Sequence, residues 1–508
     1  MDIATNADTY SQKIEASPSP DREADTGPAP HRPLVFVAAL STIFMVAIEG
    51  TIVATAMPTI VGALGGIDLF SWIFGAYLLT QAILIPIYGR LSDLYGRKPI
   101  LLFGIAVFLV GSALCGLAWN MISLIAFRVV QGIGAGALIP VSQAVIADIY
   151  SGEARARMQG YISSTFGSAA VIGPMIGGLI ATHVSWKAVF WLNIPLGIVA
   201  ASLLIVALKE EVKPRRHAID YIGAMLMASS TAIIMIALIH ADTFSGTVLA
   251  AAFGVSALLI AALIFYESRI SEPMIPVRLY RNRLIAGGNW LGVANGAISM
   301  AVIGFLPVYM QGLLGSSTLV AGLALGAMSV LMPLGGFVGS RLVLRMSYRL
   351  SSAIGGVILV TGSILLILLH PGASPLLPII AAGAMGLGMG ITNVSSVVAI
   401  QANVDWSQRG AAMSSVFFSR IIGQSFGSAV FGGIFNSGLA GRGVNGNEFV
   451  HLLQEGRQQI ANIPGIEAVL DAMAHALHSI YLLSGVIAVL VLAVALTYPA
   501  ALRLIDER

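Results

Sequence analysis

One acidic residue lies deep within a long apolar stretch near the start of the chain. Glu49 stands inside the hydrophobic run 34–56, and we place no other acidic residue so far inside an apolar segment. A charge at the centre of a membrane costs about 3 kcal/mol, so this side chain should face the protein interior and pair with a cation or bind a proton. Burial favours the neutral acid. Such a carboxyl group can load a proton on one side of a membrane and release it on the other.

An arginine lies inside another apolar run. Arg128 opens a glycine-rich segment that includes Gly132 and Gly136, within residues 121–147. Arginine keeps its proton in proteins, so at this depth it requires a partner or a water-filled cavity. Three interpretations of Glu49 are therefore open: proton coupling, a structural ion pair with Arg128, and a position at the lipid edge. The two glycines lie one turn apart and would let another helix approach closely, and pure packing is the alternative role of this segment.

The composition indicates the class of protein. Of 508 residues, 57% are hydrophobic and only 10% are charged, whereas soluble domains carry about 25% charged residues. These values predict an all-α polytopic membrane protein in a lipid bilayer. The single cysteine, Cys115, permits no intrachain disulfide. The sequence has no P-loop motif, no metal-type Cys/His cluster and no nucleophile–base constellation, so we expect no enzyme, no cofactor, and neither ATP nor nucleic acid as a partner.

The apolar runs predict fourteen membrane-spanning helices, because a helix needs about 20 apolar residues to cross a bilayer. They lie at about 34–56, 70–88, 99–118, 121–147, 160–182, 188–208, 219–240, 247–266, 286–309, 318–340, 351–370, 376–401, 411–435 and 477–500. We group them into an N-terminal six-helix half (34–208), a linker with two extra helices (209–285) and a C-terminal six-helix half (286–500). A disordered tail (1–33), a polar outer loop (437–475) and a short C-terminal tail (501–508) complete the chain.

The distribution of lysine and arginine predicts the orientation. If the N-terminus is cytoplasmic, 22 of the 27 basic residues fall in cytoplasmic segments, three in outer segments and two inside spans. Cytoplasmic loops of membrane proteins carry an excess of basic residues. We therefore expect both termini in the cytoplasm, and the protein in the cytoplasmic membrane of a bacterium.

A charged segment links the second and third spans. It reads Gly89-Arg-Leu-Ser-Asp-Leu-Tyr-Gly-Arg-Lys98 and must turn tightly at a membrane surface, with glycines at both ends that allow the turn. It resembles the signature loop of the major facilitator superfamily, with seven of eight defined positions matching and Leu94 in place of a cation. The resemblance implies a cytoplasmic latch between two halves, and solvated loop charges, each worth little, are the alternative. The latch residues would be Gly89, Arg90, Asp93, Gly96, Arg97, Lys98 and Asp148.

The chain also repeats itself. Residues 147–158 and 402–413 share a pattern, and the segment 58–65 after the first span resembles 307–315 after the ninth. A degraded copy of the signature segment lies between residues 336 and 349, with Leu344 where an aspartate is expected. Duplicated halves are how many secondary transporters build a central site.

The sequence around Glu49 resembles the first span of fourteen-span drug/proton antiporters of this superfamily. The match covers Glu49-Gly-Thr-Ile-Val-Ala-Thr-Ala-Met-Pro58, although those proteins usually carry aspartate at the first position. The resemblance also ties Arg128 to proton transfer. The corresponding region of the ninth span has Ile298 and no acid, so a proton site of this kind belongs to the first half.

The fifth span carries a motif that resembles the antiporter motif of exporters in the superfamily. Its residues are Gly160, Gly173, Pro174, Gly177 and Gly178. Proline removes a backbone donor and bends a helix, while glycines allow close contact. We therefore expect a kinked, tightly packed helix at the interface between the halves, and a plain proline kink is the alternative.

Polar and aromatic residues within the spans are candidates for substrate contacts. They are Trp72, Gln81, Gln143, Asn393, Arg420 and Gln424. Each is as well suited to bond a neighbouring helix. If Arg420 lines a cavity, it can contact an anionic substrate, and a structural pair is its alternative.

These features and resemblances together predict a proton-coupled exporter of small, amphipathic toxic compounds that works by alternating access, with the proton as its coupling ion. The alternatives are an exporter of an endogenous metabolite or siderophore, a passive facilitator or channel, and a membrane sensor or scaffold. Glu49 and the exporter motif count against a passive pathway, and the short tails count against a sensor. A periplasmic adaptor in a tripartite system is a further candidate partner.

Overall fold

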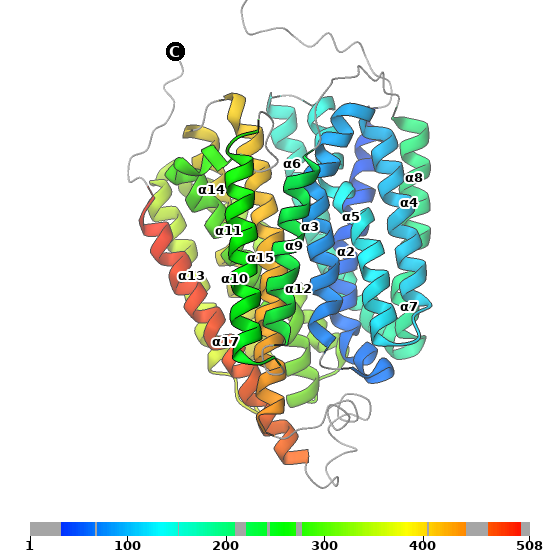
Figure 1. Cartoon of the computed structure of the whole chain (residues 1–508), viewed down its shortest axis with the longest axis vertical. Helices are drawn as coiled ribbons and strands as arrows, with labels where there is room; N and C mark the ends of the chain where they lie inside the picture. The colour runs from blue at the N-terminus through cyan, green and yellow to red at the C-terminus, as the bar shows by residue number, and fades with distance from the viewer. Residues whose placement is uncertain are drawn as a thin grey trace, which may run out of the picture.

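The computed structural model describes residues 32–66, 69–150, 152–208, 220–240, 244–270, 277–403, 406–442 and 466–498. These residues form a bundle of long helices that run side by side (Figure 1). The predicted tails, apart from residues 32 and 33 at the start of the first helix, and residues 443–465 of the predicted outer loop lie outside this described part of the chain.

The helices follow one another in the order expected for two halves with an insertion. The first half comprises α2 (Arg32–Leu64), α3 (Phe70–Tyr95), α4 (Arg97–Gly116), α5 (Met121–Ile149), α6 (Gly152–His183), α7 (Trp186–Trp191) and α8 (Asn193–Ala207). The inserted helices are α9 (Tyr221–Ile239) and α10 (Gly246–Glu267). The second half comprises α11 (Arg283–Val308), the π-helical turn η3 (Tyr309–Leu313), α12 (Thr318–Arg345), α13 (Tyr348–Ile367), α14 (Leu376–Asn403), α15 (Trp406–Ala440) and α17 (Ile466–Leu496).

The prediction of a fourteen-span helical protein is confirmed. Within the described residues, thirteen segments are long and apolar enough to cross a membrane, and α7 and α8 together count as one of them. The fourteenth is α15, which has 35 residues but is rich in serine and glycine. This helix packs against α11, α17, α3 and α9, so protein rather than lipid surrounds much of it. Its polar composition fits that interior position.

The signature segment is mostly helical, which corrects the expected turn. Helix α3 continues through Gly89 to Tyr95, and α4 begins at Arg97. The direction changes at Gly96 alone, whose φ of 94° lies in the region that favours glycine. The expected turn at a glycine is therefore confirmed for Gly96 and wrong for Gly89. Helix α3 continues past the end of the apolar run 70–88, because a helix satisfies its backbone hydrogen bonds internally whether its side chains are apolar or not. Similarly, α17 begins at Ile466, eleven residues before the predicted span.

The internal repeat is visible in the backbone. Gly65 follows α2 with φ of 70°, and Gly315 follows η3 at the end of α11 with φ of 63°. Both glycines thus end corresponding helices in the same left-handed conformation, as expected from the similar segments 58–65 and 307–315.

Glycines on two faces of α5 hold the first half together. A side chain at Gly132 would meet the Tyr77 carbonyl oxygen of α3 at 2.7 Å, and one at Gly134 would overlap the Phe108 backbone nitrogen of α4. Helices approach this closely only where no side chain intervenes. The close approach predicted for Gly132 and Gly136 is therefore present, and α3 is the helix that approaches.

The two halves meet along three seams. Helix α3 packs against α15, α6 against α12, and α2 against α11. In the first seam Ser428 donates to the carbonyl of Ser71 at 2.8 Å, and the ring centroids of Phe70 and Phe435 are 6.3 Å apart. The inserted helix α9 covers this seam, where its buried Met235 packs with Leu79 and Ala429.

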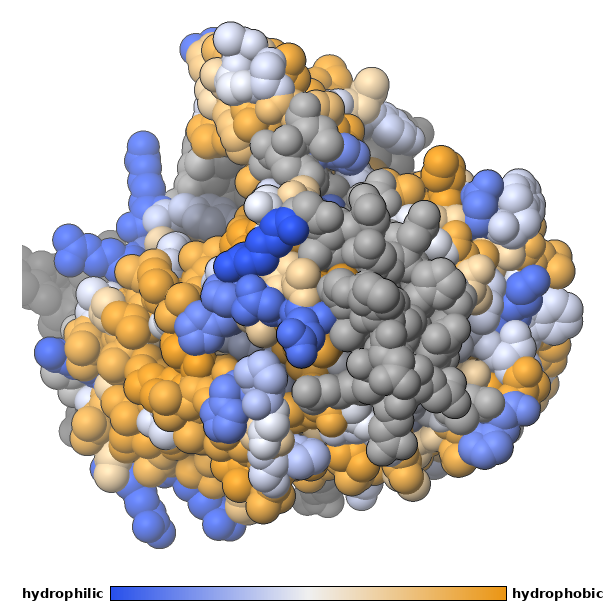
Figure 2. All heavy atoms as spheres, turned by 90° about the horizontal axis from the view of Figure 1, so that it is seen from below, coloured by the Kyte–Doolittle hydropathy of each residue, from blue (hydrophilic) through white to orange (hydrophobic). Residues whose placement is uncertain are grey.

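The outer surface of the bundle is apolar. Leu258 of α10 is 72% exposed and Val206 of α8 is 67% exposed. Figure 2 shows apolar side chains over much of the surface around one end of the bundle, with hydrophilic groups scattered among them. Such a surface suits hydrocarbon, because the helices satisfy their backbone polar groups internally.

Replacing Gly134 with leucine should destabilise the fold by about 1–3 kcal/mol or more, because the side chain would overlap the α4 backbone. The measurement is the thermal unfolding midpoint of the purified protein in detergent. Gly254→Leu is the matched control, since nothing lies within 4 Å of a side chain at that position on α10. Equal midpoints for both variants would contradict the packing described.

Candidate polar network in the N-terminal half

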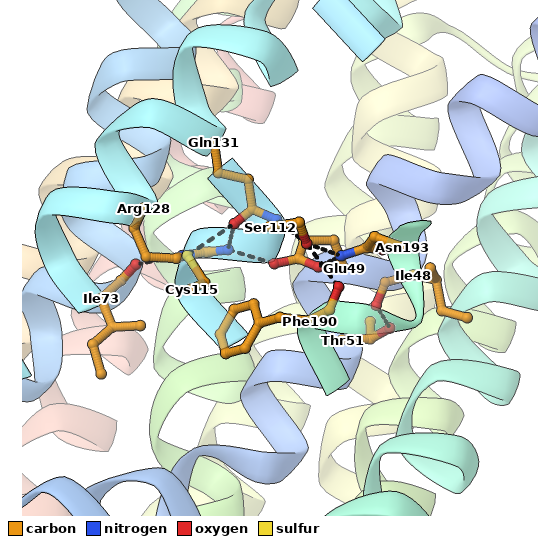
Figure 3. A network of polar contacts seen from close by, with 10 residues as sticks. All are labelled: Ile48, Glu49, Thr51, Ile73, Ser112, Cys115, Arg128, Gln131, Phe190 and Asn193. Atoms are coloured by element: carbon orange, nitrogen blue, oxygen red, sulfur yellow. Dashed lines mark hydrogen bonds and ion pairs between the residues drawn. The ribbon is translucent and has the colours of Figure 1, made fainter. Parts of the chain in front are cut away.

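Glu49 and Arg128 meet in the interior of the first half. Glu49 lies in the middle of α2, Arg128 lies two turns into α5, and Arg128 Nη1 is 2.5 Å from Glu49 Oε1 (Figure 3). The two residues are 0% and 1% exposed, respectively. The ion pair that the sequence offered as one interpretation is therefore present. The lipid-edge position is wrong, because other helices enclose the Glu49 side chain.

Local sequence fixes where Arg128 stands on its helix. Asn120 caps α5 by accepting from the Ser123 nitrogen at 2.7 Å, and the Ser123 hydroxyl lies 3.1 Å from the Asn120 nitrogen, which donates to it. This reciprocal capping box sets the first turn. The glycines that follow Arg128 let α5 lie close to α3 and α4, and the guanidinium reaches the Ile73 carbonyl of α3.

The Glu49 carboxylate has a second partner on another helix. Asn193 Nδ2, at the start of α8, donates to Glu49 Oε2 at 2.5 Å and to Ser112 Oγ at 2.8 Å. Ser112 Oγ also accepts from Gln131 Nε2 at 3.1 Å and donates to the Phe190 carbonyl at 2.8 Å. Each carboxylate oxygen thus has a donor, and Ser112 connects them to α4, α5 and α7.

The Arg128 guanidinium is surrounded by further acceptors. Its Nε donates to the Ile73 carbonyl of α3 at 3.1 Å, and Nη1 donates to Gln131 Oε1 at 2.7 Å. The guanidinium carbon lies 4.1 Å from the centroid of the Tyr77 ring, a cation–π contact. One ion pair therefore ties together α2, α3, α4, α5, α7 and α8.

This arrangement can couple protonation to packing. A proton on Glu49 would neutralise the carboxylate and leave the Arg128 charge without its counter-ion, and an uncompensated buried charge is costly. The helices that hold the pair would then favour a different arrangement. The geometry thus permits a proton-dependent switch as well as a purely structural pair.

Sequence reasoning missed four members of this network. They are Tyr77, Ser112, Gln131 and Asn193. Gln131 stood three residues after Arg128, on the same helix face, and this spacing was an available signal. Nothing in the sequence showed that Ser112 and Asn193, from two other spans, would meet Glu49.

The predicted latch residues are partly assembled. Arg97 Nη1 donates to Ser92 Oγ at 2.6 Å, and Arg97 Nε pairs with the exposed Asp148 at 3.3 Å. Lys98 Nζ donates to the Ile205 carbonyl at the end of α8 at 2.7 Å. These contacts lie within the first half. The side chains of Arg90 and Asp93 are outside the described part of the structure.

The exporter motif on α6 faces two helices, α2 and α12. Side chains at Gly173 and Gly177 would overlap Thr51 Oγ1 and the Ile52 side chain, which follow Glu49 within one turn of α2. Pro174 faces the other half, where a side chain at Gly322 of α12 would lie 2.7 Å from its Cβ. Gly178 likewise faces Thr318 of α12. Helix α6 therefore connects the α2 segment around Glu49 to the seam between halves, and Gly160 lies nearer its N-terminus.

The six substrate-contact candidates lie on four helices, α3, α5, α14 and α15. Gln81 is buried in α3, where its carbonyl faces Gly136, and Gln143 of α5 is half-buried. Trp72 packs in the cluster around Met235 of the inserted helix. In the second half, half-buried Asn393 lies in α14. Arg420 and Gln424 lie one turn apart on α15.

Comparison with known families decides the identity of the fold. A family model described as "Major Facilitator Superfamily" matches residues 39–428 of the chain. The chain belongs to this superfamily. Members of the superfamily are membrane transporters and not enzymes, and transporters of this type need no cofactor.

Two curated relatives extend over most of the chain. "Multidrug transporter protein MdtP" of Bacillus subtilis is 34% identical over 409 residues, 80% of this chain and 76% of that protein. "Multidrug resistance protein 3" of the same organism is 32% identical and covers 89% of this chain and 92% of that protein. This superfamily member is thus similar to proteins named for multidrug transport.

Solved structures support the fold. The bacterial homologue of the human lysosomal transporter Spinster, in an inward-facing and unoccupied conformation, aligns with a TM-score of 0.66, covering 92% of this chain and 97% of that one at 16% identity. The D-xylose–proton symporter aligns with a TM-score of 0.62 at 13% identity, covering 92% and 98%. At these identities the likeness concerns the architecture, two packed bundles of six helices.

Replacing one member of the Glu49–Arg128 pair should lower the free energy of unfolding more than replacing both members. Arg128→Met leaves Glu49 without its ion-pair partner and should lower the free energy of unfolding by about 3–5 kcal/mol. Adding Glu49→Leu to that variant should recover part of the loss. Unfolding of the two single variants and the double variant in detergent measures the coupling.

Arg345→Met serves as the control, because Arg345 is an exposed cation at the end of α12, and it should leave stability nearly unchanged. If the double variant loses as much unfolding free energy as the Glu49 and Arg128 single variants together, the two residues do not stabilise the fold as a pair.

Proposed function

We propose that this transporter is a proton-coupled antiporter that exports small, amphipathic toxic compounds by alternating access. The observation that carries the proposal is the buried Glu49–Arg128 pair inside a transporter fold. A carboxylate at this depth is costly to keep, and proton relays are a common function of intramembrane acids. The names of the two Bacillus relatives support multidrug compounds as cargo.

The mechanism follows from the linkage between protonation and packing. Protonation of Glu49 removes the negative charge that holds Arg128, and α2 can then shift against α5. Because Gly173 and Gly177 of α6 contact α2 while Pro174 and Gly178 contact α12, the shift is transmitted to the seam between halves. Proton and substrate favour opposite states, so they exchange across the membrane.

The membrane potential is sufficient to drive export. At about 150 mV, one charge moving inward supplies about 3.5 kcal/mol. That free energy sustains a substrate gradient of several hundredfold when coupling is tight. The excess of basic residues on one side supports a location in a bacterial cytoplasmic membrane with both termini in the cytoplasm. A periplasmic adaptor protein in a tripartite system is a further partner that we propose for this transporter.

Two other functions compete with this proposal. An exporter of an endogenous metabolite or siderophore would share the same network and seams, and its cargo would distinguish it. A passive facilitator or channel would have no use for a buried acid. Transport that persists at full rate without a proton gradient or voltage would favour the passive class.

Glu49→Gln should abolish proton-driven efflux while leaving the protein folded and able to bind substrate. The amide keeps the size of the side chain but has no ionisable proton. The measurement is ethidium efflux in inverted vesicles energised with a pH gradient, together with ethidium binding to the purified protein. Asp471→Asn is the control, because this exposed acid lies outside the network. Full efflux by the Glu49→Gln protein would remove Glu49 from the mechanism.

Joining α6 to α12 should stop transport, because the halves must move along that seam. Gly178→Cys and Thr318→Cys, in a Cys115→Ala background, place two thiols where a Gly178 side chain would lie 3.5 Å from Thr318 Cγ2. Oxidation should arrest ethidium efflux and a reductant should restore it. The Gly178→Cys single variant is the control. Unchanged efflux by the cross-linked protein would exclude movement along this seam.

A further inference from the structure

The second half contains an arginine in the middle of α15 whose surroundings differ from those of Arg128. Arg420 Nη2 lies 3.8 Å from Met332 Sδ of α12, and a thioether is a weak acceptor. Among the residues that the structure describes, no carboxylate lies within ion-pair distance of Arg420. Arg128 by contrast has a carboxylate, an amide and a carbonyl as acceptors. Within the described part of the chain, Arg128 has a carboxylate partner and Arg420 has none.

Arg420 is only partly enclosed by the packed helices. Arg420 and Met332 are both half-buried, although each lies in the middle of a helix that packs against the first half, α15 against α3 and α12 against α6. A side chain at Gly296 would overlap the Arg420 carbonyl oxygen, so the backbone of α15 packs directly against α11 here. The guanidinium extends from that contact toward α12.

The neighbours of Arg420 suit an amphipathic molecule. Gln424, one turn along α15, is half-buried, and its amide nitrogen donates to Ser299 of α11 at 3.3 Å. Met332 offers a flexible apolar surface on the other side. The region thus combines one cation, polar groups and a thioether.

We propose that Arg420 binds the anionic group of transported compounds, so that the cargo includes amphipathic organic carboxylates. The inference rests on the proposed export function. An arginine inside a membrane protein needs a counter-charge, and its planar fork matches a carboxylate through two parallel hydrogen bonds. Because the chain supplies no carboxylate there in the described residues, the substrate supplies it. Arg420 thus selects acids over their neutral esters.

This assignment has an electrical consequence. Exchange of one inward proton for one outward monovalent anion moves two charges across the membrane per cycle. Exchange of the same proton for a neutral ester moves one charge. Export of an acid should therefore respond more steeply to the membrane potential than export of its ester.

The test compares how tightly dansyl-phenylalanine and its methyl ester bind to the purified full-length protein at equilibrium. Dansyl fluorescence reports binding, and no proton gradient is applied. The wild type should bind the acid at least about tenfold more tightly than the ester, since hydrogen bonds to charged groups are the stronger ones. Arg420→Gln should remove that preference and leave ester binding unchanged. Arg420→Lys should keep part of the preference, because lysine retains the charge without the fork.

Arg345→Gln is the matched control, since it removes an exposed cation at the end of α12 and should leave the preference intact. The proposal is overturned if the wild type binds neither compound, binds both equally, or prefers the ester, or if the preference survives in Arg420→Gln. If Arg420→Gln does not fold, an unchanged preference in Arg420→Lys overturns it. Proton-driven ethidium efflux by the wild type is measured separately, so failure of the export function is distinguished from failure of this assignment.

Discussion

The fold of the first half depends on protein groups that take the place of water around the Glu49 carboxylate and the Arg128 guanidinium. In a bilayer, the alternative to the Glu49–Arg128 contact is a bare charge in hydrocarbon, which costs several kcal/mol. The chain satisfies the pair with donors and acceptors from several helices, including Asn193, Gln131 and the Ile73 carbonyl. Such a network can hold only one relative placement of these helices, because each lost partner leaves a polar group unsatisfied. The pair therefore specifies how these helices pack.

Glycine extends this constraint to the boundary between halves. Helix α6 touches α2 through Gly173 and Gly177 and touches α12 through Pro174 and Gly178. Backbones in such close contact cannot slide independently, so a displacement of α2 must be shared by α6. The inserted helix α9 lies over the neighbouring seam, with Met235 packed between α3 and α15. Its flexible thioether can follow small movements of both helices.

The two halves share a backbone plan and differ in their charges. Gly65 and Gly315 end corresponding helices in the same conformation. However, the position of Glu49 is matched by Ile298, which is fully buried, and the second half instead carries Arg420 beside Met332. Among the described residues, one half thus has a balanced ion pair and the other a cation without a carboxylate partner. In the proposed mechanism, the first is the proton site and the second is the cargo site.

The sequence by itself determined the class, the fourteen spans and the special status of Glu49 and Arg128, because hydrophobic length and a charge inside it are local properties of the chain. It did not determine that Asn193 and Ser112 complete the network, because their meeting depends on how four helices pack. It also misjudged Gly89, since only the folded chain shows that α3 continues to Tyr95. Tertiary structure alone decided that Arg128 has a counter-ion while Arg420 reaches only a sulfur among the described residues, since pairing depends on distance in space.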